Sequence, residues 1–600
     1  MFFYWFEPRA KVYEVHDEAW RMAIWWRILL FAGCGIGGLL YAAALPPLNL
    51  NFAAFVALIQ VLVFISLERR WYWQFAAGWF WGWCHAICAY QFLREIEWFI
   101  PWLLAPVMGL FPAVWAVLAA WIMRPVVFPF SVDASGIDDR RDYLLKGAHL
   151  WRLLVFGVST AALFTAIEFS RSRLFVWNDL SVTQYRNTWF IQLAALTGSY
   201  GVGFCVALVN SALYLLCFRR GWRAALILLG AVAAAVGGGQ LYTRMLHAEN
   251  SASCCETWKV LAIQGDLSQR RHATLDQVEE ALDVYEKLSF EAMSAHPDAD
   301  ALIWPESAVP IVYYSMLDLA GRRLKGEGRL YRRYQETVRR IASYRHRPLI
   351  FGALDAEEGA FILKKKTPGL TNSALMMGGD GVLCARYDKF HRVPYGEYVP
   401  GRGLLPQSWV SAMDMGRDLI PGNHLTPWAI TLKGRGDPPF VIRPGVVICY
   451  EGVFGYVTRT HVKNGANVLL ALSNDAWYPR SSEPEQHLAN ATIRAVECGV
   501  PMIRVGNNGG TGVLTPRGEF TQVLIVPGSE KRPELRRGRG YRLLEVPIVA
   551  EPVRTFFVRR GDWFPWVIVI WCAIILLAAS RRRGALLKNG IEKTEDKPEA

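Results

Sequence analysis

Long apolar runs lie at both ends of the chain. Runs long enough to cross a bilayer occur near residues 27–45, 51–67, 74–93, 102–123, 150–170, 192–217, 222–242 and 563–580. Because about 20 consecutive apolar residues span the hydrocarbon core of a membrane, these runs predict a multi-pass α-helical membrane bundle. Some runs are short or interrupted by Gly and Pro, so we expect about eight spans.

The first apolar run has two readings. Ala42-Ala43-Ala44 resembles the cleavage site of a secretory signal peptide. About 26 residues precede the run, however, which is long for the charged start of a signal peptide. Further spans also follow, so we expect an uncleaved signal-anchor.

The middle of the chain has a different pattern. Polar helical stretches such as 274–294 and 328–345 alternate there with short β-rich runs. These runs are Val260–Gln264, Ala301–Trp304, Pro348–Gly352, Ser373–Met377, Gly445–Cys449, Val468–Ser473 and Met502–Val505. The alternation predicts a layered α/β domain over residues 246–558. The polar, charged segment 581–600 is typical of a disordered tail.

Composition and charge support a membrane protein. Hydrophobic residues make up 53% of the chain, there are 25 Trp, and the net charge is +13. The charge does not indicate nucleic-acid binding, because much of it lies in short loops between the apolar runs, where Lys and Arg mark the cytoplasmic side. One set of loops holds Arg69, Arg70, Arg124, Arg140, Arg141, Lys146, Arg152, Arg219, Arg220 and Arg223. The opposite set holds Arg94, Arg171, Arg173 and Arg186. We therefore expect both termini to be cytoplasmic and the α/β domain to be extracytoplasmic. The expected segments are a cytoplasmic N-terminal segment 1–26, a seven-helix domain 27–245, the α/β domain 246–558, a last helix 559–582 and a cytoplasmic tail 583–600.

Neither the cysteines nor the histidines have metal-ligand spacing. The eleven cysteines form no Cys-x-x-Cys pair. His391, His424, His461 and His487 are also irregularly spaced, so we expect no metal and no cofactor.

Three reactive side chains each follow a short apolar run in the middle segment. They are Glu306, Lys389 and Cys449. A thiol near a helix N-terminus or a cation becomes a better nucleophile, and the segment Glu451–Lys463 can form a helix directly after Cys449. Glu306 could then accept the thiol proton, while Lys389 and the Tyr450 backbone N–H could stabilise an oxyanion. Taken singly, a strand-end cysteine is usually inert packing, and Glu and Lys are usually solvated. The three together favour an active site.

Longer motifs around these residues resemble a known family. The matching stretches are Gln264-Gly265, Ile303-Trp304-Pro305-Glu306-Ser307, Tyr387-Asp388-Lys389, Val393–Pro400, Ile448-Cys449-Tyr450-Glu451, Ser473–Trp477 and Asn507-Asn508-Gly509. In this order they resemble the apolipoprotein N-acyltransferases, the membrane-embedded branch of the nitrilase (carbon–nitrogen hydrolase) superfamily. The family also has seven spans before the catalytic domain and one after it, so the resemblance extends over nearly the whole chain.

The resemblance implies a fold, a reaction and a set of roles. The fold is a nitrilase-like α-β-β-α sandwich attached to the membrane bundle. Glu306 would be the general base, Lys389 the oxyanion stabiliser and Cys449 the nucleophile, with Glu397, Tyr450 and Glu451 in support. The enzyme would move an acyl chain from a phospholipid, through a thioester, to the α-amino group of a diacylglyceryl-apolipoprotein in the bacterial inner membrane. A monomer without a cofactor is expected.

The chain also departs from the family pattern. Ala273 stands where the family usually has Trp, Arg392 replaces an apolar residue, and Tyr395 replaces Phe. The first change puts a substrate-loop contact in doubt.

Two charged features have alternative readings. Glu168 and Arg171 match an acidic/basic pair of the family, which either contacts a phospholipid headgroup or forms an i,i+3 ion pair. The basic run 531–539 could attract anionic lipid, although a solvated hairpin loop is the commoner case.

Two rival functions remain on sequence grounds alone. A membrane-tethered nitrilase-like amidase would use the same three residues to hydrolyse a small amide. A non-catalytic lipid- or lipoprotein-binding protein would not need them, and their presence argues against it.

Overall fold

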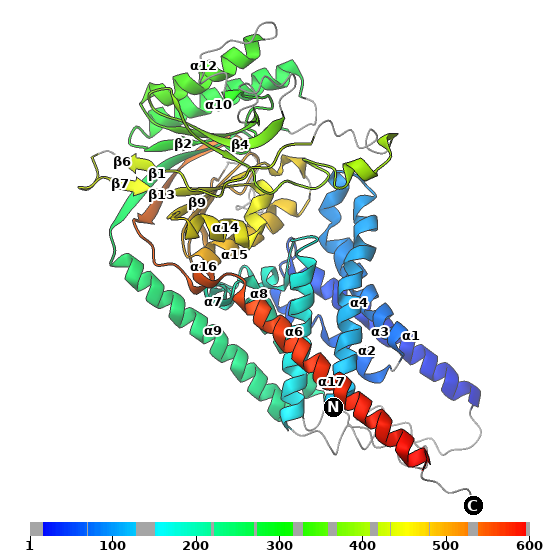
Figure 1. The fold of residues 1–600 in the computed structure, drawn as a ribbon. Coiled ribbons are helices and arrows are strands. Elements are labelled where there is room, and N and C mark those ends of the chain that lie inside the picture. Colours follow the sequence, from blue (N-terminus) through cyan, green and yellow to red (C-terminus); the bar gives the residue numbers. More distant parts are fainter. Residues whose placement is uncertain are drawn as a thin grey trace, which may run out of the picture. The chain divides into compact units, whose positions relative to one another are not determined.

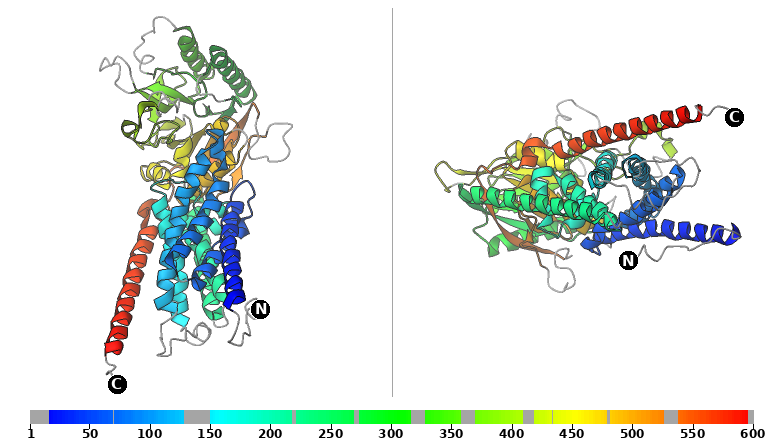
Figure 2. Two further views of the ribbon diagram at one scale, coloured as in Figure 1. Left: turned by 90° about the vertical axis from the view of Figure 1, so that its right-hand side faces the viewer. Right: turned by 90° about the horizontal axis from the view of Figure 1, so that it is seen from below.

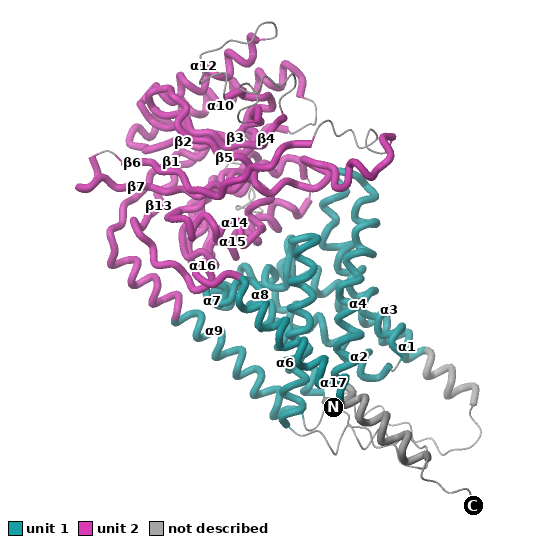
Figure 3. The backbone as a smooth tube through the Cα atoms, viewed as in Figure 1, with its two compact units in different colours: residues 1–241, 562–600 teal, residues 242–561 magenta. Residues whose placement is uncertain are grey.

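The chain folds into two compact units, which are coloured separately in Figure 3. Unit 1 comprises residues 1–241 and 562–600, and unit 2 comprises residues 242–561. The computed structural model describes residues 16–68, 70–127, 150–217, 221–268, 273–315, 328–357, 369–408, 418–432, 434–478, 481–525 and 538–595. Several of the Lys and Arg residues from which the membrane orientation was predicted lie outside these ranges, namely Arg69, Arg140, Arg141, Lys146, Arg219 and Arg220.

Unit 1 is built from helices. Within the described residues, six helical segments are long and apolar enough to cross a membrane. They are Trp25–Ala44 of α1 (His16–Ala44), Ile100–Met123 of α4 (Ile100–Val127), α6 (Leu150–Arg171), α8 (Ser199–Leu216), α9 (Trp222–Ser251) and Trp563–Arg581 of α17 (Trp563–Glu595). The predicted run 51–67 forms the short helices η2 (Asn51–Phe55) and α2 (Ile59–Leu67), and run 74–93 forms α3 (Trp71–Ala89) and η3 (Gln91–Glu95). A multi-pass bundle is confirmed, while the count of eight spans stays a prediction.

Two sequence expectations change within unit 1. The predicted span 192–217 is divided into η5 (Phe190–Leu193), α7 (Ala194–Thr197) and α8, because Gly198 adopts a positive φ of 71° and breaks the helix. The predicted disordered tail is wrong as far as Glu595, since α17 continues to that residue. The Ala-Leu-Leu-Lys stretch within it is rich in helix formers, which explains the continuation.

Small residues let the helices of unit 1 approach closely. A Cβ added at Gly38 of α1 would meet the backbone oxygen of Trp81 in α3, and one at Gly78 of α3 would meet that of Pro112 in α4. Helix packing in membranes favours such small residues at contacts. Figure 2 shows the helices of this unit running alongside one another from two further directions.

Unit 2 contains two main sheets, which lie above one another in Figure 1. The six-stranded sheet has the order β13-β1-β2-β3-β4-β5, and the five-stranded sheet has the order β12-β11-β10-β9-β8. The first consists of β1 (Cys255–Gln264), β2 (Ala301–Ile303), β3 (Leu349–Ala356), β4 (Leu370–Met377), β5 (Leu383–Asp388) and β13 (Gly540–Val549). The second consists of β8 (Pro444–Ile448), β9 (Val468–Ser473), β10 (Met502–Gly506), β11 (Gly512–Leu514) and β12 (Phe520–Thr521). A small ribbon pairs β6 (Ile430–Leu432) with β7 (Phe440–Ile442).

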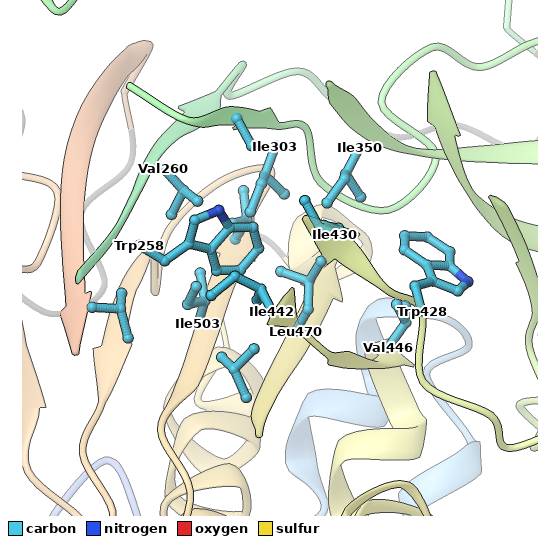
Figure 4. Packing of buried hydrophobic residues seen from close by; sticks show 14 of the residues in the cluster. Trp258, Val260, Ile303, Ile350, Trp428, Ile430, Ile442, Val446, Leu470 and Ile503 are labelled. Atoms are coloured by element: carbon cyan, nitrogen blue, oxygen red, sulfur yellow. The ribbon is translucent and has the colours of Figure 1, made fainter. Parts of the chain in front are cut away.

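The core of unit 2 lies between the two sheets. Trp258 and Val260 of β1 face Val446 and Leu470 of the other sheet in one buried cluster, shown in Figure 4. The intervening β1 residues, such as Leu261, belong to a second cluster on the opposite face of the sheet. Because both faces of β1 are buried, its sequence is a nearly continuous apolar run, the pattern from which the strand was predicted.

Helices cover the outer faces of both sheets. The second cluster joins the six-stranded sheet to α10 (Leu275–Ala295) and α12 (Gly328–Tyr344). The start of α10 is fixed by a capping box, in which Thr274 and Gln277 bond each other's backbone N–H groups. On the five-stranded sheet, α14 (Gly455–Lys463) packs on β8 and β9 beside α15 (Glu483–Cys498). The α-β-β-α sandwich is therefore confirmed.

The strand directions bring several chain segments to one edge of each sheet. Strands β8, β9 and β10 are parallel, and so are β1, β2 and β3. The carboxyl ends of parallel strands meet at the same edge, where sites in α/β folds commonly form. Glu306 follows β2, Lys389 follows β5 and Cys449 follows β8.

Candidate active site

The ammonium of Lys389 lies between two carboxylates. Its Nζ is 3.4 Å from Oε1 of Glu306 and 3.0 Å from Oε1 of Glu397. The Lys389 side chain is only 1% exposed, so its charge depends on these partners rather than on water. Burial alone would lower the pKa of Lys389, but the charges of Glu397 and Glu306 outweigh burial and raise it. Lys389 is therefore a fixed cation at the sheet edge.

Asn372 forms a second bridge between the same carboxylates. Its Nδ2 donates to Oε1 of Glu306 and to Oε1 of Glu397, each at 2.8 Å. Asn372 lies on β4, which pairs with β5, the strand that ends just before Lys389. It was absent from the sequence prediction, since only the pairing of β4 with β5 brings it to the site.

The other oxygen of Glu306 is held from the second sheet. The backbone N–H of Asn474, just after β9, donates to Oε2 of Glu306 at 3.0 Å. Asn507, after β10, donates through Nδ2 to Oδ1 of Asn474 at 3.0 Å. Glu306 thus has both oxygens hydrogen-bonded, one from each sheet, which fixes its orientation.

Cys449 occupies a strained turn at the end of β8. Its φ of 49° lies in the left-handed region, which costs a non-glycine residue roughly 1–2 kcal/mol. The residue opens a 3-10 turn, η7 (Cys449–Val453), and α14 begins only at Gly455. A helix directly after the cysteine was predicted from Glu451 onward, and the turn delays it. Cys449 is partly exposed, whereas Glu306 and Lys389 are buried.

The surroundings of Cys449 favour the protonated thiol. Although its side chain is partly accessible, surrounding protein desolvates the sulfur, and this raises the pKa of Cys449 well above its ordinary value. The charge of Glu306 raises it further, and Lys389 lowers it only in part. From the sequence, a cationic neighbour was expected to favour thiolate. With its pKa raised, the thiol would need a base to remove its proton in order to act as a nucleophile.

Glu306 has the properties of such a base. Burial raises the pKa of its carboxyl group, while the charge of Lys389 acts in the opposite direction. Glu397 raises the pKa further, and hydrogen bonds from Asn372 and Cys449 lower it. A carboxylate with a raised pKa holds a proton more readily, which suits it to take one proton and return it later.

Glu451 clamps the two segments that carry Lys389 and Cys449. Its Oε1 accepts from the backbone N–H of Phe390 at 2.6 Å, and its Oε2 accepts from that of Ile448 at 2.7 Å. Tyr387 also donates its hydroxyl to this carboxylate at 2.9 Å. Burial raises the pKa of Glu451 to about 7, and the hydrogen bonds oppose that shift.

Tyr450 lies beside the nucleophile and packs among aromatic rings. Its ring centroid is 5.0 Å from that of Phe454 and 6.0 Å from that of His391. The side chain is nearly buried, at 9% exposure. Its packing stabilises the turn that begins at Cys449.

Behind Cys449 the structure assembles a polar cluster that sequence spacing did not reveal. Its members are Asp475, His487 and Arg504, from η8 (Asp475–Trp477), α15 and β10. One potential ligand atom each from Cys449, Asp475 and His487 lies within 4.8 Å of the others. Arg504 pairs with Asp475, however, so a cation already neutralises this carboxylate.

Glu168 and Arg171 make internal contacts in unit 1. Glu168 accepts from the hydroxyl of Tyr41 and the backbone N–H of Leu180, both at 3.1 Å. Arg171 lies 3.8 Å from Glu168 and donates to the carbonyl of Trp177 at 2.9 Å. Both side chains are buried, and this geometry favours the ion-pair reading.

The departures from the family pattern lie around the site in unit 2. Ala273 lines a cavity of about 220 Å³ together with Asp266, Gln277 and Ser307. Arg392 donates to the carbonyl of Leu419 at 2.6 Å and covers the ring of Tyr398. Of the basic run 531–539, residues 531–537 lie outside the described part of the chain, and Arg539 pairs with Glu280.

Comparison with known proteins yields two family matches. Residues 261–529 match the carbon-nitrogen hydrolase model, and residues 37–212 match the model of the apolipoprotein N-acyltransferase N-terminal domain. The apolipoprotein N-acyltransferase of Geobacter metallireducens is 31% identical over 71% of this chain and 74% of its own length. That of Shewanella oneidensis is 27% identical over 80% of each chain. That of Thermosynechococcus vestitus is 25% identical over 93% of this chain and 96% of its own.

Proposed function

The chain belongs to the apolipoprotein N-acyltransferase family, and from that premise we propose that Cys449 carries the fatty acyl group which the enzyme transfers to lipoproteins. The acyl donor is a membrane phospholipid. The acceptor is the α-amino group of the S-diacylglyceryl-cysteine at the N-terminus of an apolipoprotein. Glu306, Lys389 and Cys449 form the catalytic triad, and Glu397 and Glu451 support it.

In the first step the thiol attacks the ester carbonyl carbon of the phospholipid. Glu306 takes the thiol proton as the carbon–sulfur bond forms. The carbonyl oxygen becomes an oxyanion, which the fixed charge of Lys389 stabilises. When the carbon–oxygen bond breaks, the leaving alkoxide takes the proton from Glu306, so lysophospholipid departs and a thioester remains on Cys449.

In the second step the neutral acceptor amine attacks the thioester carbon. Glu306 accepts a proton from the amine, and Lys389 again stabilises the oxyanion. Collapse breaks the carbon–sulfur bond, and the sulfur recovers its proton from Glu306. The products are an amide on the lipoprotein and free Cys449 thiol, so each cycle returns the enzyme to its starting state. Two half-reactions at one nucleophile predict ping-pong kinetics.

We also infer in which membrane the protein lies and on which side its catalytic domain faces. The protein is a multi-pass protein of the bacterial inner membrane. The surplus of Lys and Arg in one set of loops supports cytoplasmic termini and a periplasmic catalytic domain, and we expect the enzyme to act as a monomer.

The observation that carries the proposal is the triad geometry. The partly exposed Cys449 forms a side-chain hydrogen bond with the buried carboxyl group of Glu306, and that group is 3.4 Å from the Lys389 ammonium. Transfer from a phospholipid to a diacylglyceryl-cysteine peptide tests it in detergent or vesicles. Cys449→Ala should abolish transfer, whereas Cys384→Ala, which changes another cysteine of unit 2, should not. Undiminished transfer by the Cys449→Ala variant would contradict the proposal. Ammonia release from small amides without lipid transfer would favour an amidase.

A further inference from the structure

The backbone at Cys449 needs an external support, because its left-handed conformation is unfavourable for a side chain with a Cβ. The carbonyl oxygen of Cys449 accepts a hydrogen bond from Nε2 of His487 at 3.0 Å. His487 lies on α15, one helical turn after Glu483, at the start of the helix drawn below the sheet in Figure 1. The bond therefore joins the nucleophile's own peptide to a helix that contributes no member of the triad.

The opposite side of the His487 ring is fixed as well. Nδ1 lies 3.1 Å from Oδ1 of Asp475, and Asp475 also pairs with Arg504. The hydroxyl of Ser473 donates to the same carboxylate oxygen of Asp475. The imidazole thus links the end of β8 to the end of β9, and Asp475 extends the link to Arg504 within β10.

The hydrogen-bond pattern determines which groups donate. A carbonyl oxygen only accepts, so Nε2 of His487 donates in its bond to Cys449. Arg504 and His487 together outweigh burial and lower the pKa of the Asp475 carboxyl group. The carboxyl group of Glu483 also lies near the ring, with Oε1 3.8 Å from Nδ1, and burial raises its pKa well above its ordinary value.

Burial makes these bonds strong and their loss costly. His487 and Asp475 are each 2% exposed, and Arg504 is 1% exposed. Water cannot replace a lost donor easily at such a depth, so the Cys449 carbonyl would lose a buried hydrogen-bond partner. The same burial holds the ring in one orientation.

We propose that His487 is a positioning residue, which holds the Cys449 carbonyl and thereby aims the thiol at Glu306 and Lys389. The inference rests on the proposed function, since it assumes that Cys449 is the nucleophile. His487 acts on the rate of thioester formation and not on binding of the phospholipid. Asp475 and Arg504 act through His487 by orienting its ring.

Two substitutions of His487 separate positioning from simple folding. His487→Ala removes both hydrogen bonds, and we expect thioester formation to slow about 100-fold, the effect of a misplaced reacting group. The KM for phospholipid should not change. His487→Gln retains an N–H that can reach the Cys449 carbonyl, so its rate should lie between those of His487→Ala and the wild type. The full-length enzyme in detergent is used throughout, with single-turnover acylation followed by mass spectrometry.

A matched control comes from the neighbouring helix. His461 on α14 is also fully buried against β8, but it lies outside this network. His461→Gln should leave the rate of thioester formation within about twofold of wild type, since it moves no group of the triad. If His487→Ala fails to fold, His487→Gln and Asp475→Asn decide the question, and both should slow acylation with unchanged KM.

Several results would overturn the inference. The first is a wild-type rate of thioester formation in the His487→Ala variant. The second is an equal loss of that rate in both His487 variants together with a raised KM for phospholipid. The third is one stoichiometric metal ion bound by the Cys449, Asp475 and His487 side chains. A failure of the proposed function looks different, because wild-type enzyme would then form no thioester. In that case the alkylation rate of Cys449 by iodoacetamide still reports on the thiol's position, and an unchanged rate in His487→Ala would count against positioning.

Discussion

Lys389 lies closer to Glu397 than to Glu306, with Nζ to Oε1 distances of 3.0 and 3.4 Å. The ammonium is therefore held more closely by Glu397, which we propose as a supporting residue, than by the proposed base Glu306. Asn372 repeats the arrangement by donating to both carboxylates at 2.8 Å. Lys389 is thus not paired with Glu306 alone, which is consistent with the proposed role of Glu306 as the base.

The first prediction concerns Glu397. Glu397→Gln preserves the shape of the side chain but removes the nearer counter-charge of Lys389. We expect acyl-enzyme formation to fall by about 10²-fold, the lower end of what general acid–base catalysis contributes. The pKa of Glu306 should also fall, because the charge of Glu397 raises it.

Thioester formation measured by rapid quench, with thermal unfolding in detergent as a control, tests this prediction. The unfolding temperature should fall, because the buried ammonium of Lys389 loses one of its two carboxylates, so rates are compared at a temperature at which both proteins are folded. A wild-type rate in Glu397→Gln would remove Glu397 from the supporting set.

The second prediction concerns pH. Only ionised Glu306 accepts the thiol proton, and burial raises the pKa of this carboxyl group. The acylation rate should therefore fall as the pH decreases through that raised value, at a higher pH than an ordinary glutamate would give. In the Glu397→Gln variant this fall in the acylation rate should occur at a lower pH. A rate that instead rises toward low pH would contradict Glu306 as base.

The third prediction concerns unit 1. Glu168→Ala leaves the buried guanidinium of Arg171 without its carboxylate, which costs about 3–5 kcal/mol for a buried pair. We expect a lower unfolding temperature in detergent and an unchanged KM for phospholipid. The alternative, a headgroup contact, predicts the reverse: a raised KM with unaltered stability.

The fourth prediction concerns orientation in the membrane. Cys254 and Cys255 are exposed near the start of unit 2, and Cys217 is exposed before the predicted cytoplasmic loop at 218–223. In spheroplasts a membrane-impermeant maleimide should label the first two, and Cys217 only after permeabilisation. Peptide mass spectrometry distinguishes the sites. Labelling of Cys217 alone before permeabilisation would invert the proposed topology.

Local pattern was sufficient for the elements that are buried on both faces. Strand β9 has the predicted bounds, Val468–Ser473, because it is a continuous apolar run. Strand β13 was missed, although it pairs with β1 along its whole length. Pro547 lies within it, which weakens a strand prediction, and its partner β1 is more than 270 positions away, so its pairing gave no local signal.

The three residues of the proposed triad could be singled out from the sequence because each follows a strand and carries a reactive group. The residues that contact them, Asn372 and His487, were not predictable from the sequence, because they reach the site only through sheet pairing and helix packing. The left-handed backbone of Cys449 was equally hidden, because strand and helix patterns on either side say nothing of the φ between them.

The central claim is that Cys449 carries the acyl chain, and the mass of the intact enzyme tests it most directly. After incubation with a phospholipid of known acyl composition and no acceptor, the wild-type enzyme should gain the mass of one acyl group. The group should map to the Cys449 peptide, leave on treatment with hydroxylamine, and be absent from Cys449→Ala. An active enzyme that never acquires this mass, or a Cys449→Ala variant that does, would contradict the account.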